Sequence, residues 1–339
     1  MDRLELSKNY PLRIGTHSEV FHCDEVLACF MLLQLDEFAN SRIIRTREQR
    51  LLSECDIVVD VGGVYDKSIH RYDHHQRDFE HTLSSLRPEL GKQWTIRLSS
   101  AGLIYAHFGE RILQAIYKKN TGRTISDEAL KVIYLKIYEN FIQEIDAIDN
   151  GIPMYEGEPL YRITTNLSSR IANFNPQWNC IETESQYELF KSAMSYAGNE
   201  LEDRILYYVN SWWPARKLVE ECLAERHQVH ASEEIMELKG QFPWKEHLFD
   251  LESVQKIEGK LKFVIFQTYD VWRVQAIPVQ PKSFVVRQPL QPKWWGYRDE
   301  KLDEVSGISG CIFCHSTGFI GGNKTREGAL KMALESLVA

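Results

Sequence analysis

The first third of the chain alternates short apolar runs with a helical pattern of apolar positions. Residues 12–17, 42–46 and 55–63 are short apolar runs, and we expect each of them to form a strand. Residues 24–38 carry apolar side chains at helical spacing between the first two runs. Strands and helices that alternate at these distances predict an α/β domain with a doubly wound, mostly parallel sheet.

Polar side chains stand where two of these predicted strands end. His17 closes the first run, and Asp60 lies near the end of the third, just before the Gly62-Gly63 pair. In doubly wound sheets the ligand crevice lies outside the carboxyl ends of the strands. We therefore expect a binding site at this edge of the sheet.

The remainder of the chain changes its pattern twice. From residue 99 to about residue 229 the apolar positions follow helical spacing, including one helix over 126–151 and a long helical region over 187–229. After about residue 236 the pattern returns to strands, and the chain closes with a strand, a glycine-rich turn and a helix. We expect an amino-terminal domain of residues 1–185, a helical connector of residues 186–230 and a smaller α/β domain of residues 231–339.

Length and composition are those of an ordinary globular protein of two domains. The chain has 339 residues, of which 43% are hydrophobic and 26% charged. No run approaches the roughly 18–20 consecutive apolar residues of a membrane span, and we see no signal peptide. The seven cysteines are an odd number, which suits free thiols in a reducing compartment. We expect an intracellular protein without a membrane partner, and the composition leaves compartment and oligomeric state open.

The net charge of −8 bears on the kinds of ligand that the chain can bind. Broad, sequence-blind binding of a polyanion depends on clustered Lys and Arg, and the acidic balance argues against it. A phosphate substrate stays compatible with this charge, because bound divalent cations would supply local positive charge.

Four groups of metal-competent side chains are spread over the first half of the chain. Three stand at predicted strand ends or just beyond, and the fourth is an acid pair spaced three apart on one helix face. Imidazole and carboxylate ligands together suit Mn, Zn, Fe or Co. In chain order the groups are His17, His22, Asp24 and Glu25; Asp60; Asp73, His74 and His75; and Asp146 with Asp149.

Each group alone also has an ordinary structural explanation. A single His or Asp near a helix start is more often a cap than a ligand, and Asp60 could accept hydrogen bonds from the glycine turn. The acid pair Asp146 and Asp149 lies near the carboxyl end of its helix, where acids oppose the helix dipole unless a cation is present. Four such groups together favour a metal site.

The order of motifs resembles that of a known superfamily. "GTHSEVFHCDE", "DIVVDVGG", "YDHHQR", "LSSAGLIY" and "DAIDNG" follow one another as in the DHH phosphoesterases. The wording "RYDHHQRDF" and the terminal "CIFCHSTGFIGGNKTREGAL" resemble its Myg branch most closely. The resemblance covers nearly the whole chain and implies a DHH-type catalytic domain followed by a substrate-binding domain.

This resemblance implies a centre of two divalent cations, usually Mn²⁺, with Mg²⁺, Co²⁺ or Zn²⁺ as alternatives. Asp60 would bridge the two cations, and His74 and His75 would join it in catalysis, with His75 directed at the phosphate. Most of the superfamily has Asp where His22 stands here, so one cation would gain a softer, neutral ligand. The implied metal ligands are His17, His22, Asp24, Asp60, His74 and one or both of Asp146 and Asp149.

The carboxyl-terminal segment combines a C-x-x-C-H sequence with a glycine-rich stretch. Covalent haem attachment at Cys311, Cys314 and His315 needs an export signal that we do not find, and a zinc ribbon needs a second C-x-x-C. We instead expect a phosphate-binding turn like that of the superfamily's substrate-binding domain; a purely structural turn is the alternative. The expected substrate-binding residues are His75, Arg273, His315, Gly318, Gly321, Gly322, Lys324 and Arg326.

Several further side chains have two interpretations. Arg287 could pair with phosphate, and Trp294 and Trp295 could stack on bases or pack against the neighbouring prolines. Arg45 and Arg47 could be surface charges or could face the crevice.

The sequence thus predicts a metal-dependent hydrolase of phosphoric ester bonds. The substrate expected from the resemblance is RNA or a short single strand, trimmed exonucleolytically from 3′ to 5′, as in RNA processing. We expect a cytoplasmic or nuclear location, and the family resemblance alone adds the mitochondrion. A small-molecule phosphatase and a non-catalytic metal-binding regulatory protein are the alternatives.

Overall fold

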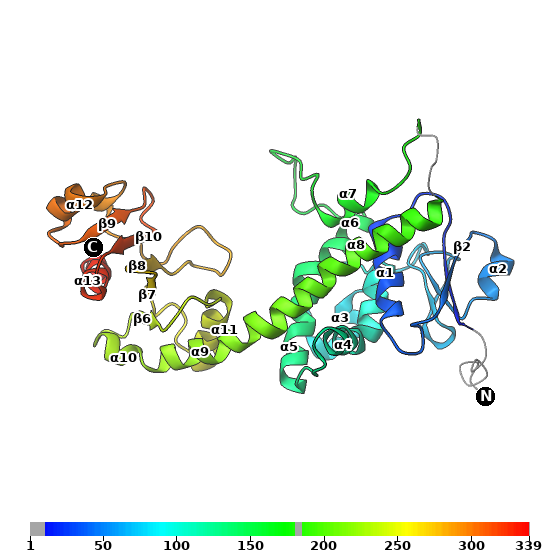
Figure 1. Cartoon of the computed structure of the whole chain (residues 1–339), viewed down its shortest axis with the longest axis horizontal. Helices are drawn as coiled ribbons and strands as arrows, with labels where there is room; N and C mark the ends of the chain where they lie inside the picture. The colour runs from blue at the N-terminus through cyan, green and yellow to red at the C-terminus, as the bar shows by residue number, and fades with distance from the viewer. Residues whose placement is uncertain (1–10, 180–184, 339) are drawn as a thin grey trace. The chain divides into compact units, whose positions relative to one another are not determined.

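The computed structural model describes residues 11–179 and 185–338, and the chain forms two compact units, Met1–Val209 and Asn210–Ala339 (Figure 1). The helical region expected to be a separate connector is divided between them. Its first helix, α8 (Gln186–Tyr207), packs on α1 of unit 1, and α9 (Trp213–Ala224) packs on α11 and β6 of unit 2. A π-helical turn, Tyr208–Trp212, lies between the two helices in the chain.

Unit 1 contains the expected parallel sheet. Its strand order is β2-β1-β3-β5-β4, with β4 alone antiparallel to its neighbour. The third strand is much shorter than the apolar run that predicted it, because the chain turns into a left-handed conformation at Asp60. The strands are β1 (Arg13–Thr16), β2 (Arg42–Arg45), β3 (Ile57–Val59), β4 (Tyr65–Asp66) and β5 (Arg71–Tyr72).

Helices pack against this sheet, α1 on β3 and α4 on β5. The predicted helix over 126–151 is α5, a π-helical turn (Tyr138–Ile142) and α6 in direct succession. Helix α1 is buried along most of its length and packs on both α4 and α8. The helices are α1 (Cys23–Leu33), α2 (Gln49–Ser53), α3 (Leu83–Leu86), α4 (Ser100–Thr121), α5 (Asp127–Ile137), α6 (Gln143–Asp149) and α7 (Leu167–Ala172), with 3₁₀ turns at Lys67–Ile69 and Pro88–Leu90.

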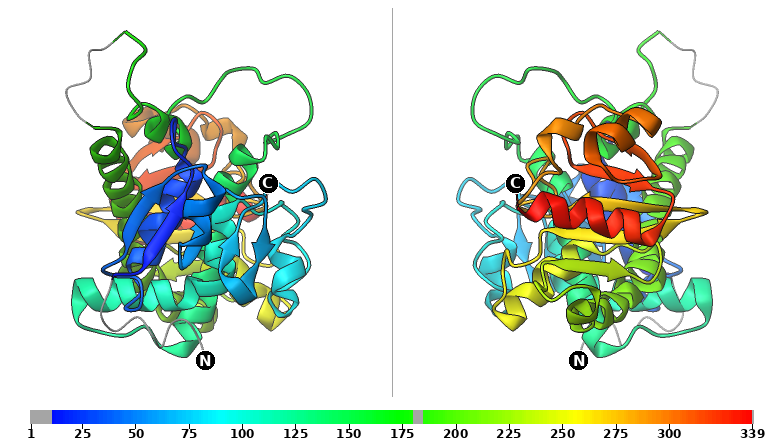
Figure 2. Two further views of the ribbon diagram at one scale, coloured as in Figure 1. Left: turned by 90° about the vertical axis from the view of Figure 1, so that its right-hand side faces the viewer. Right: turned by 90° about the vertical axis from the view of Figure 1, so that its left-hand side faces the viewer.

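Unit 2 is the smaller α/β unit, and α13 lies across one face of its sheet (Figure 2). Its strand order is β6-β7-β8-β10-β9, in which only β6 and β7 are parallel. Phe263, Ile265 and Val274 pack toward α13, whereas Val264 packs toward α9 and α11. The elements are α10 (Arg226–Val229), β6 (Ile235–Leu238), α11 (Lys245–Gln255), β7 (Phe263–Thr268), β8 (Val271–Ala276), α12 (Asp299–Ser306), β9 (Cys311–Cys314), β10 (Ile320–Asn323) and α13 (Arg326–Leu337), with a 3₁₀ turn at Pro292–Trp294.

The α/β class and the two-sheet architecture predicted from the sequence are confirmed by these elements. Three short strands, β4, β5 and β10, were not anticipated. No helix in the described part of the chain is long and apolar enough to cross a membrane.

A buried ion pair supports the core of unit 2. Arg287 donates from Nη1 and Nη2 to the two carboxylate oxygens of Glu252, at 2.7 and 2.6 Å, and Nη1 also donates to the carbonyl of Leu261 at 2.9 Å. The side chains of Arg287 and Glu252 are only 8% and 1% exposed. Arg287 therefore has a structural role, which corrects the interpretation that it pairs with phosphate. Trp294 is completely buried, which favours packing over base stacking for that residue.

Replacing Arg287 with Met should destabilise unit 2 by about 3–5 kcal/mol, because the charge of Glu252 stays buried without its partner. Urea unfolding of the full chain measures this change. Arg216→Met provides the control, since Arg216 pairs with Asp250 at the surface, where such pairs contribute about 0–1 kcal/mol. Equal, small effects of the two substitutions would contradict a structural role for the buried pair.

Candidate metal centre

The carboxyl ends of three neighbouring strands place two histidines and an aspartate side by side. His17 directly follows β1, Asp60 directly follows β3, and His74 lies two residues after β5. All three residues are less than 10% exposed. Neighbouring parallel strands end at the same edge of a sheet, so residues far apart in sequence meet there.

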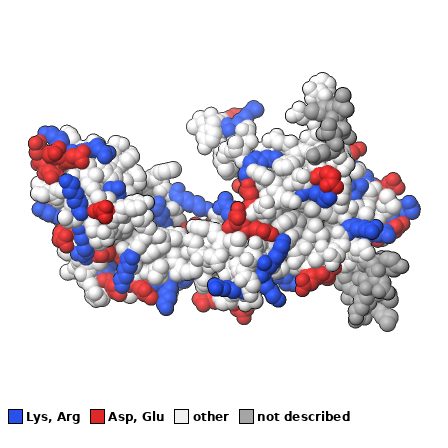
Figure 3. All heavy atoms as spheres, in the orientation of Figure 1, with Lys and Arg blue, Asp and Glu red and all other residues white. Residues whose placement is uncertain are grey.

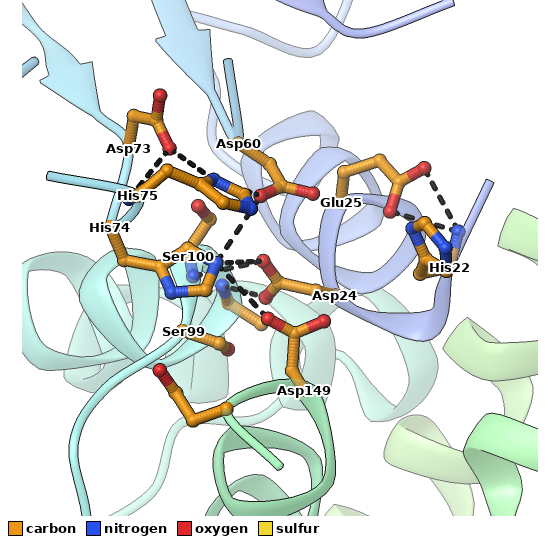
Figure 4. Close-up of polar contacts among 12 residues, drawn as sticks. His22, Asp24, Glu25, Asp60, Asp73, His74, His75, Ser99, Ser100 and Asp149 are labelled. Atoms are coloured by element: carbon orange, nitrogen blue, oxygen red, sulfur yellow. Dashed lines mark hydrogen bonds and ion pairs between the residues drawn. The ribbon is translucent and has the colours of Figure 1, made fainter. Parts of the chain in front are cut away.

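Asp60 contacts both histidines, and Figure 4 shows it beside His74 and His75. Its Oδ2 atom lies 3.4 Å from His17 Nε2, while Oδ1 lies 3.3 Å from His74 Nε2 and 3.5 Å from His75 Nδ1. The left-handed backbone of Asp60, with φ of 56°, is uncommon for a residue with a side chain. Its backbone N–H donates to the carbonyl of Tyr72 at 3.2 Å, which fixes this turn against β5.

The start of helix α1 contributes a second carboxylate next to His17. Glu25 is fully buried, with Oε1 at 3.0 Å from His17 Nε2. Both carboxylate oxygens of Glu25 also accept from the backbone N–H of His22, the N-cap residue, at 3.0 and 3.1 Å. The sequence placed Glu25 in the first group but gave it no ligand role. Its position three residues after the N-cap is the capping-box signal, and that signal alone indicates only a cap.

The N-terminus of α4 fixes two acids from other helices. Asp24 of α1 accepts from the backbone N–H groups of Ser100 and Ala101, at 3.0 and 2.5 Å. Asp146 of α6 accepts from the backbone N–H and the hydroxyl of Ser99, at 2.9 and 2.8 Å. These bonds account for the motif "LSSAGLIY", which supplies the donors.

Asp149, rather than Asp146, joins the histidine cluster. Asp149 Oδ2 lies 3.0 Å from His74 Nε2, and Asp24 Oδ2 lies 3.8 Å from the same atom. Asp146 is fully buried and bound to Ser99, and a Cβ on Gly102 would overlap its carboxylate. The sequence could not separate the two acids of α6; in the structure Asp146 lies at the helix junction and Asp149 faces His74.

Asp73 orients His75 rather than joining the cluster. One carboxylate oxygen of Asp73 lies 2.7 Å from His75 Nδ1, and the other accepts from the backbone N–H of Gly63 at 2.5 Å. The His75 side chain is 62% exposed, whereas Asp73 is buried. Asp73 thus holds both the glycine turn and the ring of His75, and leaves the Nε2 edge of that ring available.

The protonation equilibria of the cluster are shifted by burial and by close opposite charges. Burial lowers the pKa of His17, but its contacts with Asp60 and Glu25 outweigh burial and raise it to about 10. Burial likewise opposes the contacts of His74 with Asp149 and Asp60, which raise its pKa to about 11. Burial raises the pKa of Asp60, yet the two histidines hold it at about 2.

Two other carboxyl groups respond in the opposite direction. Burial, with the nearby charges of Asp149 and Asp60, raises the pKa of Asp24 well above its ordinary value. Burial also raises the pKa of Glu25. Acids packed this closely repel one another when ionised, and a cation between them relieves that repulsion.

The cluster fits a metal centre. Asp60 Oδ1 and His74 Nε2 are buried and lie 3.3 Å apart, and His74 Nε2 is also 3.0 Å from Asp149 Oδ2, so donor atoms of both kinds converge on one point. Imidazole nitrogens and carboxylate oxygens are the donors that Mn²⁺ and Zn²⁺ accept. Three sets of donor atoms lie within 4.8 Å of one another: His17, His22, Glu25 and Asp60; Asp60, His74 and His75; and Asp24, His74 and Asp149.

A cavity of about 530 Å³ opens over this cluster. Besides the donors, its lining includes the glycine pair Gly62-Gly63, Ile145 and Ile148 of α6, and Ser168 and Ala172 of α7. Arg47 also lines it, whereas the Arg45 guanidinium stacks on the rings of Phe21 and Phe190.

The expected substrate-binding residues of unit 2 divide into two sets, and the first keeps side chains available for an anion. Arg273 lies against the ring of Phe313, 5.0 Å from its centroid, and a Cβ on Gly322 would overlap the Arg273 guanidinium. Its Nη1 atom is buried without a hydrogen-bond partner among the described residues. His315 directly follows β9, Lys324 directly follows β10, and both are exposed.

The other four residues have structural tasks, which corrects the expectation of a single phosphate-binding turn. Gly321 and Gly322 lie in strand β10, which pairs with β8 and β9, and not in a turn. Gly318 is the left-handed residue of the turn, packed against the indole of Trp295. Arg326 pairs with Glu237, with Nε donating at 2.8 Å.

Comparison with solved structures finds weak similarity. RecJ of Thermus thermophilus, described in complex with Mn²⁺, is 12% identical, with a TM-score of 0.25 over 99% of this chain and 54% of that chain. An exonuclease RecJ described as bound to manganese is 12% identical, with a TM-score of 0.23 over 98% and 92% of the two chains. The fold description therefore rests on the strands and helices of this chain.

Comparison with known sequences finds close relatives. The protein called MYG1 exonuclease is 52% identical over 330 residues in both Bos taurus and Homo sapiens, spanning 96% of this chain and 85% and 86% of those proteins. A MYG1 protein of Saccharomyces cerevisiae is 36% identical over 344 residues, or 99% and 98% of the two chains. The model of an uncharacterised protein family, UPF0160, matches residues 13–337. The chain belongs to this MYG1 family, as its series of motifs predicted.

Proposed function

We propose that this protein is a metal-dependent phosphodiester hydrolase that removes nucleotides from one end of RNA or of a short single strand, from 3′ to 5′. The observation that carries the proposal is the position of Asp60, a buried carboxylate that belongs to two sets of metal-competent donors. The name exonuclease given to relatives that are 52% identical supports the same activity.

The two cations that fit the site would be Mn²⁺, with Mg²⁺, Co²⁺ or Zn²⁺ as alternatives. Asp60 would be shared between His17, His22 and Glu25 on one side and His74 on the other. Asp24 and Asp149, which form a separate donor set with His74, would complete the second side. When bound, such a pair lowers the pKa of a water and stabilises charge on the reacting phosphate oxygens.

His75 is the protein group placed to meet the phosphate. Its hydrogen bond with Asp73 raises the pKa of His75, which favours the protonated ring. The bond also directs Nδ1 at Asp73, so that Nε2 remains to donate to a phosphate oxygen. Asp73 acts through His75 by setting the orientation of its ring.

The charge distribution favours an end-directed enzyme over one that encloses long duplexes. Lys and Arg are scattered among Asp and Glu on the face shown in Figure 3, and the net charge is −8. Proteins that track polyanions use continuous basic tracts instead. In unit 2, Arg273 with its unpaired Nη1, beside Gly322, together with His315 and Lys324, is the set that we propose for holding substrate.

The size of the cavity keeps a small-molecule phosphatase as the second candidate. About 530 Å³ is within the range of sites for small molecules. Hydrolysis of labelled RNA, pyrophosphate and cyclic dinucleotides, each with MnCl₂ and with EDTA, separates the two activities. Release of mononucleotides from RNA alone supports the exonuclease. Turnover of pyrophosphate alone would replace it with the phosphatase, and turnover of nothing would favour a non-catalytic metal-binding protein.

Asp60→Asn should remove metal binding and activity together, because one substitution takes a shared ligand from both donor sets. MnCl₂ should raise the melting temperature of the wild-type chain through preferential binding to the folded state, and should not raise that of the variant. Hydrolysis should fall about a thousand-fold or more. A variant that is still stabilised by MnCl₂ would contradict the shared position of Asp60.

The two acids of α6 should give opposite phenotypes. Asp149→Asn should weaken Mn²⁺ binding about ten-fold or more, with less than about 1 kcal/mol of change in metal-free stability, because Asp149 is a donor at the cavity. Asp146→Asn should cost about 1–3 kcal/mol, since it disturbs buried hydrogen bonds to Ser99, and should leave Mn²⁺ affinity within ten-fold. Calorimetric titration with MnCl₂ and urea unfolding measure the two quantities, and the reverse pattern would overturn the assignment.

A further inference from the structure

Arg47 is the one Lys or Arg among the described residues that line the metal-centre cavity. It comes two residues after the end of β2, and the preceding Thr46 extends the strand by donating its N–H to the carbonyl of Thr16 at 2.7 Å. The hydroxyl of Thr46 then accepts from the N–H of Glu48 at 3.1 Å. The backbone on both sides of Arg47 is therefore anchored, which fixes where its side chain begins.

Arg47 is exposed, and no hydrogen bond or ion pair joins its side chain to another residue in the described parts of the chain. The nearby Arg45 is half-buried, and its guanidinium has partners. Arg45 donates to the carbonyl of Glu19 at 2.7 Å and stacks on two phenylalanine rings. Of the pair, Arg45 supports the fold, and Arg47 is free to meet a ligand.

The order of strands puts Arg47 and His75 on opposite sides of the metal ligands. Along the carboxyl edge, β2 carries Arg47, β1 carries His17, β3 carries Asp60, and β5 leads to His75. With about 4.8 Å between neighbouring strands, β2 and β5 are about 14 Å apart. A nucleic-acid backbone that runs along this edge would have one phosphate at the ligands and the next one near β2.

The negative charge of the cluster also favours a positively charged side chain beside the metal ligands. Four buried or half-buried carboxylates, Asp24, Glu25, Asp60 and Asp149, face the cavity or its donors. Two divalent cations would balance these four negative charges and would leave no positive charge to balance a second phosphate. Arg47 supplies a positive charge beside the centre, and a guanidinium matches the geometry of phosphate oxygens.

We propose that Arg47 binds the phosphate adjacent to the scissile one, so that the site recognises a dinucleotide unit with two phosphates. This inference rests on the proposed hydrolase function and names a contact of the same site. Arg47 would then make the site select substrates by their length and by the presence of a terminal phosphate.

Three dinucleotides test the proposal with the full chain and MnCl₂: ApA, which has one phosphate, and pApA and ApAp, which carry a second one on either side. We expect the wild type to prefer one of the doubly phosphorylated dinucleotides. Arg47→Met should lower kcat/KM for that substrate about 10- to 100-fold, mainly through KM, and for ApA less than about three-fold. Arg47→Lys should restore part of the loss, because it keeps the charge without the fork.

Arg42→Met is the matched control, since Arg42 is an exposed arginine at the amino end of the same strand. It should change no substrate preference. The salt dependence gives an independent measure: Arg47→Met should reduce the slope of log affinity against log KCl by about 0.7–1. An equal loss on all three dinucleotides, which would place Arg47 at the scissile phosphate, or no loss on any, overturns the proposal.

Equilibrium binding of the same dinucleotides with CaCl₂ distinguishes the failure of this inference from the failure of the hydrolase proposal. Arg47-dependent preference in binding without any turnover in MnCl₂ would keep the phosphate subsite and remove the hydrolase. Turnover with a substrate preference that is unchanged in Arg47→Met would keep the hydrolase and remove the phosphate subsite. Neither binding nor turnover would overturn both.

Discussion

The amino end of helix α4 is the point on which the geometry of the centre depends. Its first backbone N–H groups bind Asp24 from α1 and Asp146 from α6, so three helices meet through two carboxylates. The unpaired N–H groups and the dipole of a helix start favour negative charge, and partial burial strengthens the interaction. Asp24 also lies in the first turn of its own helix, so two helix starts act on one carboxylate. This junction sets where Asp24 and, one turn further along α6, Asp149 face His74.

The junction explains why a cluster of acids can be buried at all. Donors from α4 offset only part of the cost for Asp24, whose pKa burial still raises well above its ordinary value. His17 and His74, on the other side, hold the pKa of Asp60 at about 2. The fold therefore compensates some carboxylates with helix ends and others with imidazoles. The remaining deficit of positive charge is what suits the cluster to divalent cations.

The sequence predicted the edge of the sheet well and the detail within it less well. Apolar runs followed by His17 and Asp60 were enough to locate the centre, because strand ends converge by topology alone. The choice between Asp146 and Asp149 was beyond sequence spacing, since both lie on the same side of α6 and only the position of α4 separates them. Glu25 was not predicted as a ligand, because its position three residues after the N-cap is already explained by helix capping. In unit 2 the glycines suggested a turn, whereas Gly321 makes room for Met332 of α13 and Gly322 for Arg273 of the neighbouring strand β8.

Asp73 and Thr46 position two side chains at this edge of the sheet, His75 and Arg47, that have no assigned role as metal ligands. Asp73 ties the glycine turn to His75 on one side of the ligands, and Thr46 anchors the segment that carries Arg47 on the other. Both anchoring residues are buried, and both groups that they position are exposed. A phosphate chain is flexible, so a site that recognises it gains selectivity when its cationic contacts start from fixed backbone rather than from mobile loops. The edge of this sheet thus combines a row of metal-competent donors with one exposed basic side chain on each side, Arg47 beyond β1 and His75 beyond β3.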